Sequence, residues 1–288
     1  MKNFSTSTPL FSKNLSLNLG GRIMNLSTPR IMGIINATPD SFYHESRAAS
    51  PELAVEKARE MIDQGADILD LGAVSSRPGA EEISESEELD RLSPTLEALR
   101  NNFPEFPLSV DTCRSGVARS VKERFGIHMI NDISAGNLDP AMFSTMAELG
   151  IPYIMMHMQG TPATMQEEPA YDHFVDELLH FFAERVYKLR KLGLNDIIID
   201  PGFGFGKTLE QNYELLREFN SFQMLELPIM AGISRKSMIY KLLGTGPELA
   251  LNGTTAAHMA ALLKGANLLR VHDVAAAKET VKIFQQIC

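Results

Sequence analysis

Short apolar runs alternate with longer segments of helical period along most of the chain. The runs are rich in Ile, Leu, Val and Met, which is typical of parallel strands that are buried on both faces. They span residues 30–35, 67–71, 108–110, 128–130, 153–156, 197–199, 228–231 and 268–271. The segments that follow them place polar and apolar side chains on opposite helical faces. They span residues 51–64, 86–101, 114–124, 140–149, 173–192, 209–219, 253–264 and 275–286.

This alternation predicts an α/β fold. Several helical segments begin with a capping residue and a proline, as at Ser50-Pro51 and Asp139-Pro140. Eight β-α repeats in 288 residues favour a closed (β/α)8 TIM barrel, and an open doubly wound sheet is the alternative. We expect residues 1–29, which include a Gly20-Gly21 turn, to be a short N-terminal extension or a hairpin at the barrel bottom. Residues 30–288 contain no linker or low-complexity segment and are expected to form a single barrel domain.

Polar residues follow the apolar runs at the ends where a TIM barrel carries its active site. They include Asn36, Arg77, Asp111, Asn131, Asp132, His157, Asp200, Lys236, Arg270 and His272. One polar residue after a strand is ordinary, because loops are polar and often cap the next helix. Amide, carboxylate and cationic groups after all eight runs indicate an active site on this rim.

The residue types at the rim suggest a substrate. Asn131 and Asp200 can together bind the donor and acceptor edge of a heterocycle such as an aminopyrimidinone. A cationic group suited to phosphate or pyrophosphate consists of Arg77, Arg235, Lys236, Arg270 and His272. A pyrophosphate normally brings Mg²⁺, which needs few protein ligands, and the Asn36 oxygen is a candidate ligand. The sequence has no H-E-x-x-H motif and no Cys/His cluster, which argues against zinc.

A glycine-rich stretch, PGFGFGKT at residues 201–208, ends like a nucleotide-binding P-loop. The P-loop needs a glycine five positions before Gly-Lys-Thr, and that position is Pro201. The dinucleotide pattern G-x-G-x-x-G is absent here too, because Gly202, Gly204 and Gly206 alternate. The stretch is therefore not read as a phosphate-binding loop.

Composition narrows the class of protein. The net charge of −9 disfavours nonspecific binding to nucleic acid or to a membrane, so an anionic substrate needs a local cationic site. No run of about 18 apolar residues occurs, and the N-terminus has no apolar core of signal-peptide length. Only Cys113 and Cys288 are present, an unusual framework for a secreted fold. We expect a cytoplasmic protein with small-molecule substrates and no nucleic-acid or membrane partner.

The chain resembles the dihydropteroate synthase family in eight segments that keep the family's order and spacing over residues 28–284. The segments are IMGIINATPDSF, GADILDLGAVSSRPGA, SVDTCRSGVA, INDIS, IMMHMQGTPATMQ, IIIDPGFGFGKTLEQNYELL, GISRKSMIYKLLG and LLRVHDV. The resemblance implies a (β/α)8 barrel, usually a homodimer, that acts in folate biosynthesis with Mg²⁺ and is a target of sulfonamides. It implies a transferase that joins p-aminobenzoate to 6-hydroxymethyl-7,8-dihydropterin pyrophosphate, giving 7,8-dihydropteroate and pyrophosphate.

The resemblance also assigns roles to individual residues. The pterin-binding residues would be Asp111, Asn131, Met156, Asp200, Phe205, Gly232 and Lys236. The pyrophosphate-binding residues would be Asn36, Arg77, Arg270 and His272, with Asn36 as the metal ligand. The p-aminobenzoate-binding residues would be Ser76, Arg77, Pro78, Lys236 and Ser237. The catalytic residues would be Asp111, Lys236, Arg270 and His272, acting on a methylene cation that forms as pyrophosphate leaves.

Two loops depart from the family pattern. The first reads Tyr-His-Glu-Ser-Arg at 43–47, where the family usually has a serine, an aspartate and two glycines. In the second, Ala73, Val74 and Ser76 replace a glycine, an acid and a threonine. Both loops close over the acceptor in the family, which keeps a non-catalytic pterin-binding paralogue open as an alternative. A barrel-type pterin methyltransferase is a second alternative that would share the aspartate and asparagine floor, but it has no need for Arg77, Lys236, Arg270 and His272 around a pyrophosphate.

Overall fold

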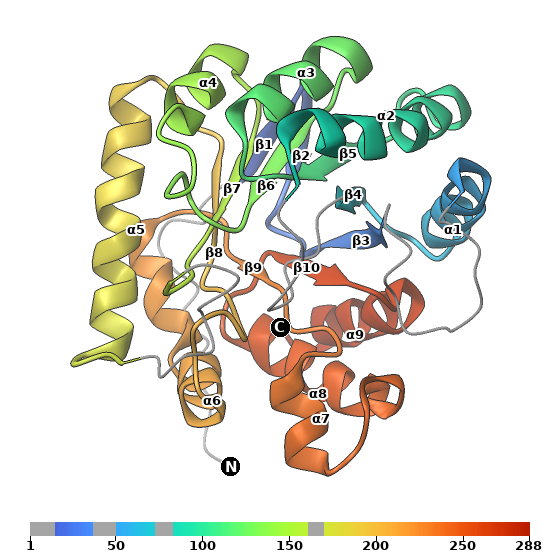
Figure 1. The fold of residues 1–288 in the computed structure, drawn as a ribbon. Coiled ribbons are helices and arrows are strands. Elements are labelled where there is room, and N and C mark those ends of the chain that lie inside the picture. The colour runs from blue at the N-terminus through green and yellow to red at the C-terminus, as the bar shows by residue number, and fades with distance from the viewer. Residues whose placement is uncertain (1–14, 37–49, 73–82, 161–169) are drawn as a thin grey trace, which may run out of the picture.

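The chain folds into a ring of parallel strands surrounded by helices (Figure 1). The computed structural model describes residues 15–36, 50–72, 83–160 and 170–288. The strands of the ring are β3 (Arg30–Asn36), β4 (Ile68–Gly72), β5 (Leu108–Asp111), β6 (Met129–Asp132), β7 (Tyr153–Met156), β8 (Ile197–Asp200), β9 (Met230–Ala231) and β10 (Leu268–Val271). Their order is β8-β7-β6-β5-β4-β3-β10-β9, and a parallel bridge between Ile199 and Ile229 closes the ring. The predicted (β/α)8 barrel is confirmed, and the open sheet is not.

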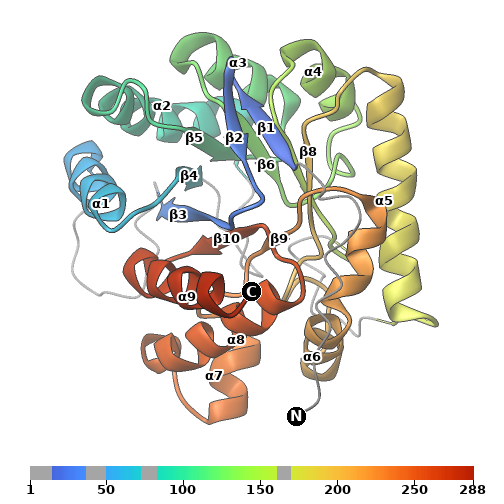
Figure 2. The same ribbon diagram turned by 180° about the vertical axis from the view of Figure 1, so that it is seen from behind.

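Helices cover the outside of the barrel, as Figures 1 and 2 show from opposite sides. They are α1 (Pro51–Asp63), α2 (Glu85–Asn102), α3 (Ser115–Phe125), α4 (Met142–Leu149), α5 (Phe174–Lys191), α6 (Leu209–Arg217), α7 (Ser237–Leu243), α8 (Leu251–Leu263) and α9 (Val274–Ile287). Two 3₁₀ helices, η1 (Phe219–Leu225) and η2 (Pro247–Leu249), lie between them. None of the helices described is long and apolar enough to cross a membrane.

Along the barrel strands, the side chains that point inward are apolar at the strand starts and mostly polar two residues later. A buried apolar cluster at the starts of the strands consists of Met32, Ile68, Met129, Ile154, Ile198, Met230 and Leu268. Side chains two positions apart on a strand point to the same face. The residues two positions after these are Ile34, Asp70, Asn131, Met156, Asp200, Gly232 and Arg270. The strands thus place a layer of mostly polar groups directly above an apolar floor.

An antiparallel hairpin of β1 (Ser16–Leu19) and β2 (Arg22–Asn25) packs against this floor. Its turn is made by Gly20 and Gly21, whose φ angles of 64° and 96° favour glycine. Leu17 and Leu19 of β1, with Leu26 after β2, belong to the same buried cluster as the strand starts. The hairpin therefore buries the apolar end of the barrel, opposite the end where the strands terminate.

The sequence pattern differs from the structure mainly around β9. The run expected at 228–231 forms only the two-residue strand β9, and the helix expected over 209–219 ends at Arg217 before η1. Helix α7 begins directly after Lys236, where only a loop was expected. Seven residues are too few for a recognisable helical period, which explains why α7 was missed.

Candidate active site

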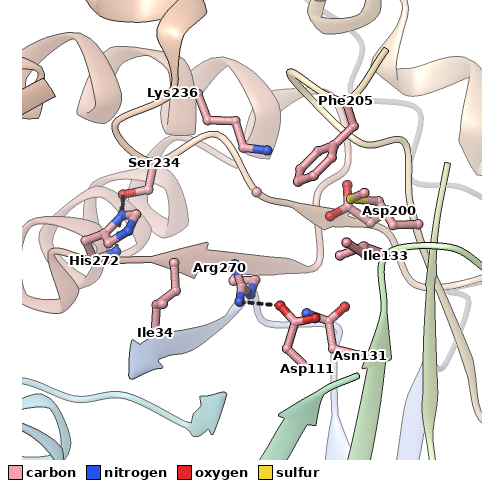
Figure 3. Close-up of a pocket in the computed structure, with 12 residues that line it drawn as sticks. Ile34, Asp111, Asn131, Ile133, Asp200, Phe205, Ser234, Lys236, Arg270 and His272 are labelled. Atoms are coloured by element: carbon pink, nitrogen blue, oxygen red, sulfur yellow. Dashed lines mark hydrogen bonds and ion pairs between the residues drawn. The ribbon is translucent and has the colours of Figure 1, made fainter. Parts of the chain in front are cut away.

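A pocket opens where the barrel strands end (Figure 3). It is lined by Ile34, Asp111, Asn131, Ile133, Met156, Asp200, Phe205, Gly232, Ser234, Lys236, Arg270 and His272. Every residue that the family resemblance assigns to the pterin is among them, and so are all four expected catalytic residues. Residues from β3, β5, β6, β7, β8 and β10 contribute, so the pocket depends on closure of the whole barrel.

Arg270 connects two carboxylates on one side of the pocket. Its Nε lies 2.7 Å from Asp70 Oδ2, and its Nη2 lies 3.0 Å from Asp111 Oδ2. Asn131 Nδ2 also donates to Asp70 Oδ2, at 3.1 Å. Desolvation raises the pKa of Asp111 to about 7, although the Arg270 charge opposes that shift. The Asp111 carboxyl can therefore ionise near neutral pH.

Asp200 and Lys236 lie on the opposite side of the pocket (Figure 3). Asp200 ends β8 and accepts a 2.8 Å hydrogen bond at Oδ1 from the Gly202 N–H. Desolvation raises its pKa, and the Lys236 charge opposes this. The Lys236 ammonium donates to the Phe203 carbonyl and lies 4.0 Å from the centre of the Phe205 ring. Desolvation lowers the pKa of Lys236 to about 8, with Asp200 acting in the other direction.

The glycine-rich stretch directs carbonyl oxygens toward lysines. Besides the bond from Lys236 to Phe203, the Lys207 ammonium donates to the Gly202 oxygen at 2.9 Å and to the Phe205 oxygen at 3.0 Å. A P-loop does the opposite, because it directs N–H groups toward an anion. The structure therefore confirms that the stretch is not a P-loop, and shows that it binds the chain's own cations.

His157 is held by the same lysine. Its Nδ1 lies 3.0 Å from Lys207 Nζ, and its ring packs edge-on against Phe181 at 4.8 Å. Desolvation, followed by the Lys207 charge, lowers the pKa of His157 to about 2. The neutral ring accepts from the lysine and supports the loop. His157 is not among the residues that line the pocket.

The cationic group in the structure is smaller than the one expected from the sequence. Arg235 donates to both oxygens of Asp273 at 2.7 Å, and its donors also reach the Pro247 and Glu248 carbonyls. Desolvation and the Arg270 charge lower the pKa of His272 to about 4, so its ring is neutral at pH 7. Including Arg235 was wrong, because Asp273 neutralises it outside the pocket. Arg270 and Lys236 remain as pocket cations among the residues described.

Of the residues expected at the acceptor and the metal, Lys236 lines this pocket, and Asn36 and Ser237 are not among its lining residues. Asn36 is exposed at the end of β3, next to Gly72 of β4. Ser237 is the first residue of α7, directly after Lys236. Ser76, Arg77 and Pro78 lie outside the described residues. Within the described ranges, no group of three or more His, Cys, Asp or Glu side chains can hold a metal ion.

The sequence analysis missed four residues at this site. Ile34, Ile133 and Ser234 line the pocket, and Ser234 Oγ lies 3.0 Å from His272 Nδ1. The fourth, Asp70, is buried and pairs with Arg270. A signal for Asp70 was present, because an acid in the middle of the apolar run at 67–71 has to be paired when the strand is buried.

Known proteins with similar sequences and structures are pterin-binding enzymes. The model of a family described as pterin binding enzyme matches residues 32–272. The dihydropteroate synthase of Escherichia coli strain K12 is 43% identical over 269 residues, 93% of each chain. A structure of Xanthomonas albilineans dihydropteroate synthase with 4-aminobenzoic acid is 39% identical and has a TM-score of 0.87. The match covers 95% of this chain and 98% of that one. The same enzyme in complex with 7,8-dihydropteroate has a TM-score of 0.81 at 36% identity, with 94% of this chain and 98% of that one covered.

Proposed function

The chain belongs to the dihydropteroate synthase family of pterin-binding enzymes, and from that premise we propose how its residues perform the family reaction. It is a transferase of folate biosynthesis that joins p-aminobenzoate to 6-hydroxymethyl-7,8-dihydropterin pyrophosphate and releases pyrophosphate. The observation that carries this proposal is the pocket at the strand ends, which combines buried hydrogen-bond acceptors with Arg270 and Lys236. An aminopterin edge presents several N–H donors, and such an array requires acceptors of this kind.

The pterin lies flat between the apolar and polar walls of this pocket. Asp200 accepts N–H groups of its aminopyrimidinone edge, because a carboxylate accepts two parallel bonds. Asn131 binds the same edge, and the Lys236 ammonium donates to an acceptor atom of the ring. Met156 and Phe205 contact its faces.

The chemical step is a substitution at the methylene carbon. The C–O bond to pyrophosphate breaks, and its electron pair leaves with the pyrophosphate oxygen. The nitrogen of p-aminobenzoate then attacks the pterin-stabilised carbon and loses a proton. Asp111 stabilises the positive charge, because Asp70 and Asp111 together outweigh the single charge of Arg270 once Asp111 is ionised. No strong general base is needed, since the arylammonium group that the new bond creates is itself acidic.

We assign pyrophosphate to the rim above Arg270, with Asn36, Arg77 and His272 as its other protein ligands. Because Arg270 is already paired with two carboxylates, Arg77 supplies much of the positive charge. Mg²⁺, when bound, neutralises the charge of the leaving oxygens. The exposed Asn36 oxygen fits Mg²⁺, which keeps several waters and needs few protein ligands. Ser76, Arg77, Pro78, Lys236 and Ser237 surround p-aminobenzoate.

We further propose that the protein is a homodimer in the cytoplasm. Support for the dimer comes from exposed leucines on α7, η2 and α8, three elements that contact one another. These are Leu242, Leu243, Leu249, Leu251 and Leu263. Clustered apolar side chains on a surface are typical of protein interfaces.

Pyrophosphate release by the purified protein tests the proposed reaction. With Mg²⁺ and the pterin pyrophosphate, we expect release that depends on p-aminobenzoate and is lost in Asp200→Ala, Lys236→Ala and Arg270→Ala. Lys241→Ala on the exposed face of α7 is a matched lysine control that should retain activity. If the pterin binds but no p-aminobenzoate concentration gives pyrophosphate, the synthase proposal fails and the non-catalytic paralogue is supported.

A further inference from the structure

Asp70 is a buried carboxylate that the reaction above does not require as a ligand. It lies in the middle of β4, is 0% exposed, and is not among the residues that line the pocket. Its Oδ2 atom accepts from two residues that do line it, Asn131 at 3.1 Å and Arg270 at 2.7 Å. Asp70 therefore stands directly behind two groups that face the ligand.

The contact with Asp70 decides which end of the Asn131 amide faces the pocket. An ionised carboxylate only accepts hydrogen bonds, so the Asn131 nitrogen must point toward Asp70 and its oxygen must point away. Figure 3 shows the amide nitrogen on the side of Asp111 and Arg270, with the oxygen on the side of Asp200. That oxygen is buried and has no hydrogen-bond partner among the residues described. It is therefore available to accept an N–H group of the ligand.

The same carboxylate keeps Arg270 between two strands. With Nε on Asp70 and Nη2 on Asp111, the guanidinium is held at two of its donor atoms. Arg270 Nε and Asn131 Nδ2 donate to the same oxygen, Asp70 Oδ2. The restraint on Asn131 thus depends on the ion pair between Asp70 and Arg270.

We propose that Asp70 is a specificity-determining positioning residue, which fixes Asn131 with its oxygen toward the ligand and thereby selects a 2-amino over a 2-oxo heterocycle. A 2-amino group donates hydrogen bonds to that oxygen, whereas a 2-oxo group meets a second acceptor. A site built to form a hydrogen bond with one buried polar group of a ligand strongly rejects an analogue that lacks that group. The inference rests on the proposed pterin site, and it extends that site to a residue behind the ligand.

Equilibrium binding, which does not require turnover, tests this role. We would measure the Kd of 6-hydroxymethylpterin and of the corresponding 2-oxo compound, 6-hydroxymethyllumazine, by titration calorimetry. The native protein should prefer the pterin by about 100-fold. In Asp70→Ala no acceptor remains for the Asn131 nitrogen, so the amide is free to rotate. The preference should then fall by about tenfold, mainly through weaker pterin binding, whereas Asp70→Asn should lower it less, because Arg270 can only donate and keeps the amide oxygen toward Asn131 as well.

Ser109→Ala is the matched control. Ser109 is paired with Asp70 in the strand register, is equally buried, and has an Oγ without a hydrogen-bond partner among the described residues. This variant should keep the native preference. A purely structural role for Asp70 predicts that both ligands weaken equally, and an unchanged ratio in Asp70→Ala would overturn the proposal. The binding measurement does not require turnover. A protein that prefers the pterin but releases no pyrophosphate would therefore contradict the synthase reaction and leave the role of Asp70 intact.

Discussion

Two residues of the pocket should ionise close to neutral pH. Desolvation raises the pKa of Asp111 to about 7 and lowers that of Lys236 to about 8. Asp111 has to be ionised to stabilise a cation, and Lys236 has to be protonated to donate. The kcat/KM for the pterin pyrophosphate should therefore fall below about pH 7 and above about pH 8, measured at saturating p-aminobenzoate.

The acid limb of this profile should respond to Arg270. The Arg270 charge lowers the pKa of Asp111, so removing it in Arg270→Gln should shift the limb to higher pH. Arg270→Lys keeps a positive charge and should leave the limb closer to its native position, whatever the loss in absolute rate. An acid limb at the same pH in both variants would show that a group other than Asp111 controls it.

At the scale of the elements, the conformation of the glycine-rich stretch between β8 and α6 depends on the buried ammonium of Lys207. Lys207→Met leaves the Gly202 and Phe205 oxygens and His157 Nδ1 without their donor. We expect the free energy of unfolding, measured in urea, to fall by about 2 kcal/mol. Pterin affinity should fall as well, because Phe205 and the Phe203 oxygen that accepts from Lys236 belong to the same stretch.

The neighbouring Thr208 provides the comparison. Its hydroxyl caps α6 by accepting from the Gln211 N–H, so Thr208→Ala should cost about 1 kcal/mol of stability. Pterin affinity should stay unchanged in this variant, because the loop carbonyls keep their lysines. Native pterin affinity in Lys207→Met would contradict the positioning of the loop by Lys207.

At the scale of the whole molecule, the leucines of α7, η2 and α8 should form the dimer interface. Replacing Leu242 and Leu249 together with glutamate buries two charges in that interface, so the protein should elute as a monomer. Size-exclusion chromatography with light scattering measures the mass directly. Tyr187→Glu on α5, a similarly exposed apolar residue on a distant helix, should remain dimeric. A native protein that is monomeric at micromolar concentration would rule the dimer out.

The barrel could be predicted because each strand and helix carries its own pattern. The apolar run at 153–156 corresponds to β7 in the structure, and the period at 51–64 matches α1 to within one residue. Local patterns fail where an element is short, as for α7, or where pairing with neighbours defines it, as for the two-residue β9.

The sequence by itself determined which residues stand at the ends of the strands. Asp111 and Asp200 end β5 and β8, and Asn131 lies one residue before the end of β6, so the type of site followed from the order of residues along the chain. The family motifs then supplied the substrate.

Only the tertiary structure decided how the charges are shared. Arg270 reaches Asp70 and Asp111, which lie 200 and 159 residues away along the chain, because alternate side chains of three strands point into one barrel. Arg235, one residue before Lys236, is instead neutralised by Asp273. The strength of an ion pair and the pKa of each partner depend on distance and desolvation, and both are fixed only when the strands close into a ring.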